Sequence, residues 1–315
     1  MQAGLIFNRP EGLDCIRHMP RVNLRDVCYN NFMGTLINLR PSPIAGQWYE
    51  GNPKALARTV DEYLGNAQLP ALDGEVVAVI APHAGHIYSG AVAGYAFAAL
   101  RGLSPELVAV ISPMHQPYYE PLITTAHDAY VTPLGNVPVD KEAVAELDAE
   151  LKSDLGFGLT FVARDREHSL EIELPFLQRV LPSEWKLLPV MVRAQDPRAS
   201  QGLGKALAKI LRGRKFILVA STDLSHFYNQ NTANRLDAEM LRRFESLDPN
   251  SIFDAERTGK GFACGHAAVA AVLWASRELG ANKVQVLHHA TSGDVTGDFS
   301  SVVGYGAAVV LKSAG

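Results

Sequence analysis

The sequence has few cysteines, no long hydrophobic run and no excess of basic residues. Its three cysteines, Cys15, Cys28 and Cys264, are too few and too scattered in 315 residues for a disulfide framework, so we expect a cytoplasmic protein. The longest uncharged apolar stretch, residues 266–276, is far shorter than the ~20 residues that a membrane-spanning helix needs. A net charge of -4 provides no basic field for a nucleic-acid backbone. We therefore expect neither a membrane nor a nucleic-acid partner.

The composition is that of an ordinary globular protein. Apolar residues make up 47% and charged residues 20% of the chain, which excludes disorder and collagen-like repeats. Residues 1–40 show weak periodicity, contain no continuous apolar segment typical of a signal peptide, and end at the Pro41-Ser-Pro43 segment. We interpret them as an N-terminal extension. Nothing within residues 41–315 resembles a linker, so we predict one α/β domain there.

Three short apolar runs are typical of strands that helices cover on both faces. They span residues 75–80, 107–111 and 216–220. The Ala-rich segment 89–100 has the length of a helix, and a strand–helix–strand succession implies parallel neighbours. The predicted fold is a three-layer α/β structure with a central, mostly parallel sheet and helices on both faces. Further helices are predicted at 52–64, 140–151, 168–180, 197–212, 232–245 and 265–279, and further strands at 187–192, 284–289 and 300–311.

Histidines follow all three apolar runs. His83 comes just after the first run, His115 just after the second, and His226 in the loop after the third, three residues beyond Asp223. Ligands of open parallel sheets bind at the carboxyl ends of the strands, and neighbouring strands lie ~4.8 Å apart. Each histidine alone is compatible with a loop residue that hydrogen-bonds to backbone. Three at successive strand ends favour side chains that converge on one ion.

Cys264 precedes Gly265 and an Ala-rich predicted helix. A helix N-terminus lowers the pKa of a thiol and favours the thiolate, which binds metals or attacks electrophiles. A small, inert cysteine buried at a tight helix entry explains the same pattern equally well. A second group, Cys15, His18 and Cys28, is an incomplete set of metal ligands.

The segment around His168 is rich in acidic residues. Glu167 and Glu171 fall in the first turn of the predicted helix 168–180, where the helix dipole alone accounts for them. The side that Glu173 faces stays open, and Pro175 would kink or tighten this helix. The sequence has no Walker loop, no G-x-S-x-G and no G-x-G-x-x-G motif, so phosphoryl transfer and serine hydrolysis have little support.

Several short motifs, in their order along residues 41–312, resemble the MEMO family, also known as protein B of the AmmeMemoRadiSam system. Each motif is weak alone, but the ordered set is specific. The matching segments are AGQWY at 45–49, IAPHAG at 80–85, YSG at 88–90, SPMH at 112–115, EHSLE at 167–171 with LP at 174–175, STDLSH at 221–226 and CG at 264–265.

The family's fold is similar to that of class III extradiol dioxygenases, which open catechol rings with non-haem Fe(II). Position by position, the resemblance implies the metal ligands His83, His115 and Cys264, the acid/base His226, and Asp223 and His168 as residues that line the site. A cysteine in place of the usual carboxylate makes the site softer, so Cu and Zn are alternatives to Fe(II). The family often has histidines where this chain has Ile44 and Gln116, two changes that alter the pocket lining but not the implied ligands.

Two classes of function follow from the resemblance. The first is an Fe(II)-dependent extradiol-type dioxygenase, an oxidoreductase acting on a catechol-like or other small aromatic substrate. The second is a non-catalytic protein that binds a metal or a peptide, because MEMO relatives are described as binding phosphotyrosine peptides and redox metals. A scaffold role is a third interpretation, with a radical SAM protein and an AMMECR-type protein as the partners that the family's name implies.

Overall fold

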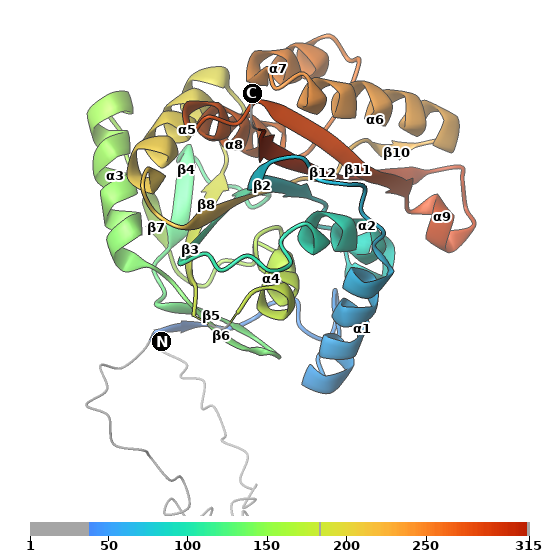
Figure 1. The fold of residues 1–315 in the computed structure, drawn as a ribbon, viewed down its shortest axis with the longest axis horizontal. Helices are drawn as coiled ribbons and strands as arrows, with labels where there is room; N and C mark the ends of the chain where they lie inside the picture. Colours follow the sequence, from blue (N-terminus) through green and yellow to red (C-terminus); the bar gives the residue numbers. More distant parts are fainter. Residues whose placement is uncertain (1–37, 183, 314–315) are drawn as a thin grey trace, which may run out of the picture. The chain divides into compact units, whose positions relative to one another are not determined.

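A mixed nine-stranded sheet forms the centre of the protein in this computed structural model, which describes residues 38–182 and 184–313 (Figure 1). Its four middle strands run parallel, and antiparallel strands extend it on both sides. In spatial order the strands are β10 (His226–Tyr228), β12 (Val302–Lys312), β2 (Glu75–Ala81), β9 (Phe216–Ser221), β3 (Leu107–Pro113), β8 (Lys186–Val192), β4 (Leu122–Thr125) and β7 (Thr160–Val162), with β11 (Lys283–Thr291) also paired to β12.

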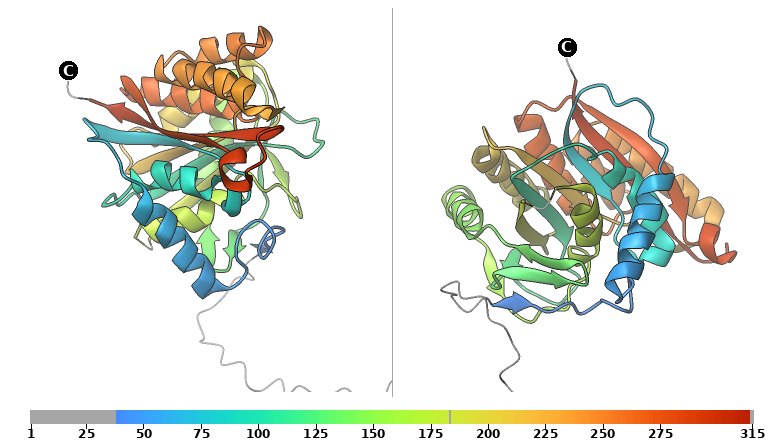
Figure 2. Two further views of the ribbon diagram at one scale, coloured as in Figure 1. Left: turned by 90° about the vertical axis from the view of Figure 1, so that its right-hand side faces the viewer. Right: turned by 60° about the horizontal axis from the view of Figure 1, so that its bottom comes forward.

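Helices cover both faces of this sheet, so the predicted three-layer α/β architecture is confirmed (Figure 2). On one face lie α1 (Pro53–Asn66), α2 (His86–Ala98), the 3-10 turn η1 (Glu171–Glu173) and α4 (Leu174–Val180). On the other lie α3 (Lys141–Leu155), α5 (Pro197–Leu211), α6 (Gln230–Glu245), α7 (Pro249–Arg257) and α8 (His266–Glu278). The short α9 (Gly293–Thr296) precedes β12. No helix in the described part of the chain is long and apolar enough to cross a membrane.

Local sequence explains where the helices begin. The Asn52 side chain accepts hydrogen bonds from the backbone of Lys54 and Ala55, and Pro53 occupies the first turn of α1. Asp140 and Asp196 cap α3 and α5 in the same way. Gly94 lets α1 and α2 approach closely, because a Cβ there would lie 2.6 Å from the carbonyl oxygen of Tyr63. The helix starts predicted at 52, 140 and 197 therefore lie within one residue of the observed ones.

The order of the central strands corrects one prediction. β2 and β3 are parallel, as expected, but they are not neighbours, because β9 lies between them and pairs with both. The inserted strand, β9, follows β3 more than 100 residues later in the chain. A sequence pattern contains no signal for such a long-range pairing.

The helix predicted at 168–180 is shorter than expected. Residues 169–170 form a turn, η1 follows, and only residues 174–180 are α-helical. The reason is Pro175, which has no N–H to continue a helix from the preceding turn and occupies the first turn of α4.

Several short elements were not predicted. They are α7, the strands β4, β7 and β10, and a small separate sheet of β1 (Leu39–Arg40), β5 (Ala129–Thr132) and β6 (Gly135–Pro138). β1 lies within the predicted extension 1–40, whose earlier residues, like Cys15, His18 and Cys28, fall outside the described part. Most of these elements have only two to four residues, too few to show a period.

Candidate metal centre

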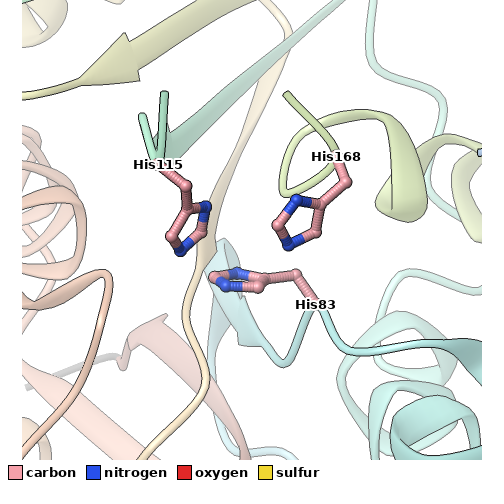
Figure 3. Close-up of side chains that lie close together, drawn as sticks. All are labelled: His83, His115 and His168. Carbon is pink, nitrogen blue, oxygen red and sulfur yellow. The ribbon is translucent and has the colours of Figure 1, made fainter. Parts of the chain in front are cut away.

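Three histidine rings converge at the carboxyl end of the sheet (Figure 3). His83 follows β2, His115 follows β3, and His168 belongs to the turn before η1. One ring nitrogen from each lies within 4.8 Å of the other two. His83 is buried, His168 is half-buried and His115 is exposed, so the cluster extends from the core to the surface. Such a group of imidazoles has the donor atoms that Fe, Zn and Cu bind.

A hydrogen bond to Ser221 fixes the orientation of the His83 ring. Its Nδ1 lies 2.9 Å from the Ser221 hydroxyl oxygen, which also lies 2.7 Å from the Ser169 carbonyl and 2.6 Å from the Glu173 carboxyl group. Because the single Ser221 proton is directed at one of these two oxygens, Nδ1 of His83 is the donor, and its Nε2 carries the lone pair. Burial and the neighbouring imidazoles of His115 and His168 lower the pKa of His83 well below its usual value, so the ring is neutral. A neutral imidazole with a free Nε2 is in the form that binds a metal ion.

Glu167 organises the other two histidines. His115 donates to the Glu167 carboxylate through its backbone N–H at 2.5 Å and through Nδ1 at 2.9 Å. The ring of His168 lies 3.3 Å from the same carboxylate. Burial opposes ionisation of Glu167, but the hydrogen bond and charge of His115 outweigh it and hold the pKa of Glu167 well below its usual value. The interpretation of Glu167 as a residue that serves only the helix dipole was therefore wrong: its carboxylate contacts the cluster.

Burial lowers the pKa of His168 to about 4, against the opposing charge of Glu167. The indole of Trp48 lies over this ring, with centroids 4.2 Å apart. His168 is thus neutral and its ring is held between Trp48 and His115, whose ring stacks on it at 4.8 Å. The resemblance placed His168 among the residues that line the site, and the structure brings it into the cluster itself.

Cys264 contacts the cluster from another side. Its Sγ lies 3.1 Å from Nε2 of His83 and accepts a hydrogen bond from the backbone N–H of Asp223 at 3.3 Å. Gly265 permits this approach to the end of β9, because a Cβ there would lie 2.3 Å from the carbonyl oxygen of Ser221. Desolvation and the nearby Asp223 carboxylate raise the pKa of the Cys264 thiol. Of the two alternatives left open by the sequence, a thiolate and a buried thiol, the raised pKa favours the protonated thiol in the metal-free protein.

Comparison with known proteins covers most of the chain. The family model for Memo-like proteins matches residues 40–309. The chain belongs to the Memo-like family. A MEMO1 family protein of Nitrosopumilus maritimus is 34% identical over 275 residues, which cover 85% of this chain and 98% of that protein. A relative of the same name from Methanothermobacter thermautotrophicus is 35% identical over 277 residues, covering 85% and 98%. A third, from Methanococcoides burtonii, is 32% identical and covers 87% and 100%.

Among solved structures, the crystal structure of an uncharacterized Escherichia coli K12 protein, JW3007, covers 75% of this Memo-like chain and 100% of its own. The TM-score is 0.46 and the sequence identity 13%. This likeness is too distant to support a statement about function.

The two remaining predicted site residues of the Memo-like chain lie next to the cluster. Asp223 accepts a hydrogen bond from the backbone N–H of His83 at 2.8 Å, and burial raises its pKa to about 7. His226 begins β10 and is not one of the three clustered histidines. Its Nδ1 donates to the Leu224 carbonyl at 2.8 Å, so Nε2 carries the lone pair. Together with Cys264, His226 lines a cavity of about 340 Å³.

A buried arginine, which sequence reasoning missed, holds the segment that carries Glu167 and His168. Arg40 is 1% exposed and donates through Nε and Nη2 to Asp165, through Nη2 to the Glu167 carbonyl at 2.7 Å, and through Nη1 to Glu171. Glu171 also accepts a hydrogen bond from the Tyr49 hydroxyl at 2.7 Å. Glu171 is thus part of a buried ionic network, and its assignment to the helix dipole alone was wrong.

A signal for this network was present in the sequence. Acidic side chains at 167, 171 and 173 alternate with Leu170, Ile172 and Leu174, and one helix face cannot expose all the charges while burying all the apolar residues. Some of the carboxylates therefore had to be buried and paired. The partner of the Glu171 carboxylate, Arg40, precedes it by 131 residues and could not be identified from spacing.

Proposed function

We propose that this Memo-like protein is a non-haem metalloprotein that binds Fe(II) at the carboxyl end of its sheet and acts as an extradiol-type oxidoreductase on small aromatic substrates. The observation that carries the proposal is the convergence of His83, His115 and His168. Two of these rings donate Nδ1–H to a fixed oxygen, on Ser221 and on Glu167, and so direct Nε2 at the shared space. Such partners fix the orientation of metal-bound histidines.

The donor set fits a transition metal. Cys264 Sγ lies 3.1 Å from Nε2 of His83, so both atoms would be in reach of one ion once the thiol has lost its proton. This contact supports Cys264 as a ligand beside the imidazoles. Imidazole suits Fe, Cu and Zn, and a thiolate shifts the preference toward the softer Cu(I) and Zn(II).

Bound Fe(II) would supply the ability to combine a phenolate with O₂ on one centre. The chain's own residues would do the rest. His226 has its Nε2 lone pair free and lines the cavity beside Cys264, which suits it to take the proton of a substrate hydroxyl. The exposed Trp48 indole packs against the half-buried His168 ring and would shield that side of the centre from water.

Anaerobic titration of the metal-free protein with Fe(II) tests the metal site. We expect one tight equivalent in the wild type and its loss in His83→Ala, with His168→Ala and Cys264→Ala showing which of these side chains is a ligand. His289→Ala is the matched control. His289 lies in β11, pairs with Asp237 at 2.9 Å and is not one of the three clustered histidines. Absence of tight binding by the wild type would contradict the proposal.

Oxygen uptake tests the reaction. With Fe(II) bound, we expect consumption of O₂ in the presence of a catechol, and loss of that consumption in His226→Ala while the iron remains bound. Tight metal binding without any O₂ uptake across a catechol series would instead favour the non-catalytic metal-binding protein.

A further inference from the structure

The cavity beside Cys264 has a definite chemical character. It measures about 340 Å³, within the usual size range of small-molecule sites. Apolar side chains form much of its wall, and the polar groups come from β10, α7, the start of α8 and the loop between β8 and α5. The lining residues are Gln195, Leu224, His226, Tyr228, Glu256, Phe262, Ala263, Cys264 and His266. The cavity therefore joins Cys264, which contacts His83, to a second polar group, Glu256 with His266.

His226 presents an acceptor to this cavity. His226 donates Nδ1–H to the Leu224 carbonyl, and His266 donates Nδ1–H to the Ala263 carbonyl at 3.0 Å. A carbonyl oxygen only accepts, so Nδ1 is the donor in both rings. Burial lowers the pKa of His226, which leaves the lone pair on its Nε2, and this atom has no hydrogen-bond partner among the described residues. A ligand in the cavity therefore meets an imidazole acceptor and must supply a hydrogen-bond donor.

Glu256 adds a negative charge to the same wall. Its side chain is only 22% exposed, accepts a hydrogen bond from the Ala263 backbone at 2.7 Å and lies 3.4 Å from His266 Nδ1. Burial raises the pKa of Glu256, while the Ala263 backbone N–H and the neighbouring His266 imidazole oppose this rise. No lysine or arginine is among the described residues that line the cavity. The charge pattern disfavours anions and suits a cationic group.

We infer that the cavity binds a small phenol that carries a protonated amine, with the ammonium group on the carboxylate of Glu256 and the aromatic body against Leu224, Tyr228 and Phe262. The inference rests on the proposed function in one respect: the hydroxyl group of the ligand would lie at the Cys264 end, next to the metal centre. It assigns to the site a substrate class, aminoalkyl phenols, and excludes phosphorylated and carboxylated aromatics as good ligands.

Two probes of nearly the same shape and opposite charge test this inference. Tyramine carries an ammonium group where 4-hydroxyphenylacetate carries a carboxylate, and neither chelates iron as a catechol does. We expect calorimetric titration of the full chain to show tyramine binding at least about tenfold more tightly than 4-hydroxyphenylacetate. Glu256→Gln keeps the acceptor for the Ala263 backbone but removes the charge, and should abolish the preference, whereas Glu256→Asp should retain part of it.

Glu142→Gln is the matched control, because Glu142 is an exposed acid in the first turn of α3 and does not line the cavity. It should leave the preference unchanged. Equal binding of the two probes by the wild type, or a preference that survives in Glu256→Gln, would overturn the inference. Both the metal-free and the Zn-loaded protein are measured, so that the two proposals can fail separately. A preference for tyramine in a protein that fails to bind Fe(II) would support the amine site. The same result would contradict the proposed oxidoreductase function.

Discussion

The two ends of the parallel strands differ in the way they carry charge. At the amino end, Glu106 and Lys215 form an ion pair of 3.7 Å whose side chains are 70% and 76% exposed. At the carboxyl end, His83, Ser221 and Glu173 are almost fully buried and form a chain of hydrogen bonds. Water solvates the charges at the first end, whereas the buried polar groups at the second end interact only with other groups of the protein.

This difference indicates where buried polar groups reduce the stability of the fold and are available for chemistry. Buried polar atoms normally have hydrogen-bond partners, yet Glu173 Oε2 and His86 Nδ1, near the carboxyl end, have none among the described residues. Burial and the nearby Asp223 carboxylate raise the pKa of Glu173 well above its usual value. Such uncompensated groups are typical of functional sites, and Glu173 contacts Ser221 directly behind the candidate metal centre.

The largest contrast is expected between buried and exposed arginines. Arg40→Ala leaves Asp165 and Glu171 buried without their cation and should lower the free energy of unfolding by about 3–5 kcal/mol, measured by urea denaturation. Arg179→Ala, which removes an exposed pair with Asp61, should cost less than about 1 kcal/mol. Similar losses in the two variants would remove the distinction between buried and exposed charge.

Binding of a metal ion at the carboxyl end of the sheet should raise the free energy of unfolding. With free Zn(II) at about 100 times its dissociation constant, the free energy of unfolding should rise by about 2.7 kcal/mol, and a chelator should reverse the gain. The gain should vanish in His83→Ala and in whichever of His168→Ala and Cys264→Ala removes a ligand. An equal gain in all three variants would mean that the metal binds elsewhere.

His86 makes the carboxyl end sensitive to acid. Burial lowers the pKa of His86 to about 4, while the unfolded chain titrates near 6.5, so below 6.5 the unfolded state binds the extra proton. The contribution of His86 to stability is therefore complete above pH 6.5 and should fall by about 1.4 kcal/mol per pH unit from 6.5 toward 4. His83 and His168, whose pKa values burial also lowers, add to the slope in the same direction. In urea denaturation at a series of pH values, His86→Gln, which retains a donor for the Ile172 carbonyl, should show a slope smaller by about 1.4 kcal/mol per pH unit. Equal slopes in the two proteins would contradict this assignment.

The smallest effect is expected at the amino end. Lys215→Ala should change the free energy of unfolding by no more than about 0.5 kcal/mol, and high salt should abolish the difference. A larger, salt-insensitive loss would show that this end too depends on its charges.

The sequence predicted those parts of the fold that depend on local pattern. The apolar runs at β2, β3 and β9 and the capped helices α1, α3 and α5 were found almost at their observed bounds. The strand order was not predictable, because it depends on pairing between segments that are distant in the chain. Short edge strands were missed for lack of a period.

The candidate site was predictable to a similar extent. His83 and His115 follow from their places at strand ends, and Cys264 and His168 came from the family resemblance. The roles of Glu167 and Arg40 could not be predicted from the sequence, because each residue depends on a partner 52 or more residues away. A carboxylate just before a turn has the same sequence signature whether it serves a helix dipole or an imidazole.

The central claim is that the imidazoles at the carboxyl end hold a metal ion, and anomalous diffraction at the iron edge from crystals grown anaerobically with Fe(II) tests it most directly. We predict one strong peak about 2.0–2.4 Å from the ring nitrogens of His83 and His115, with His168 or Cys264 as a further ligand. Crystals that contain iron elsewhere, or none beside these rings, would contradict the account.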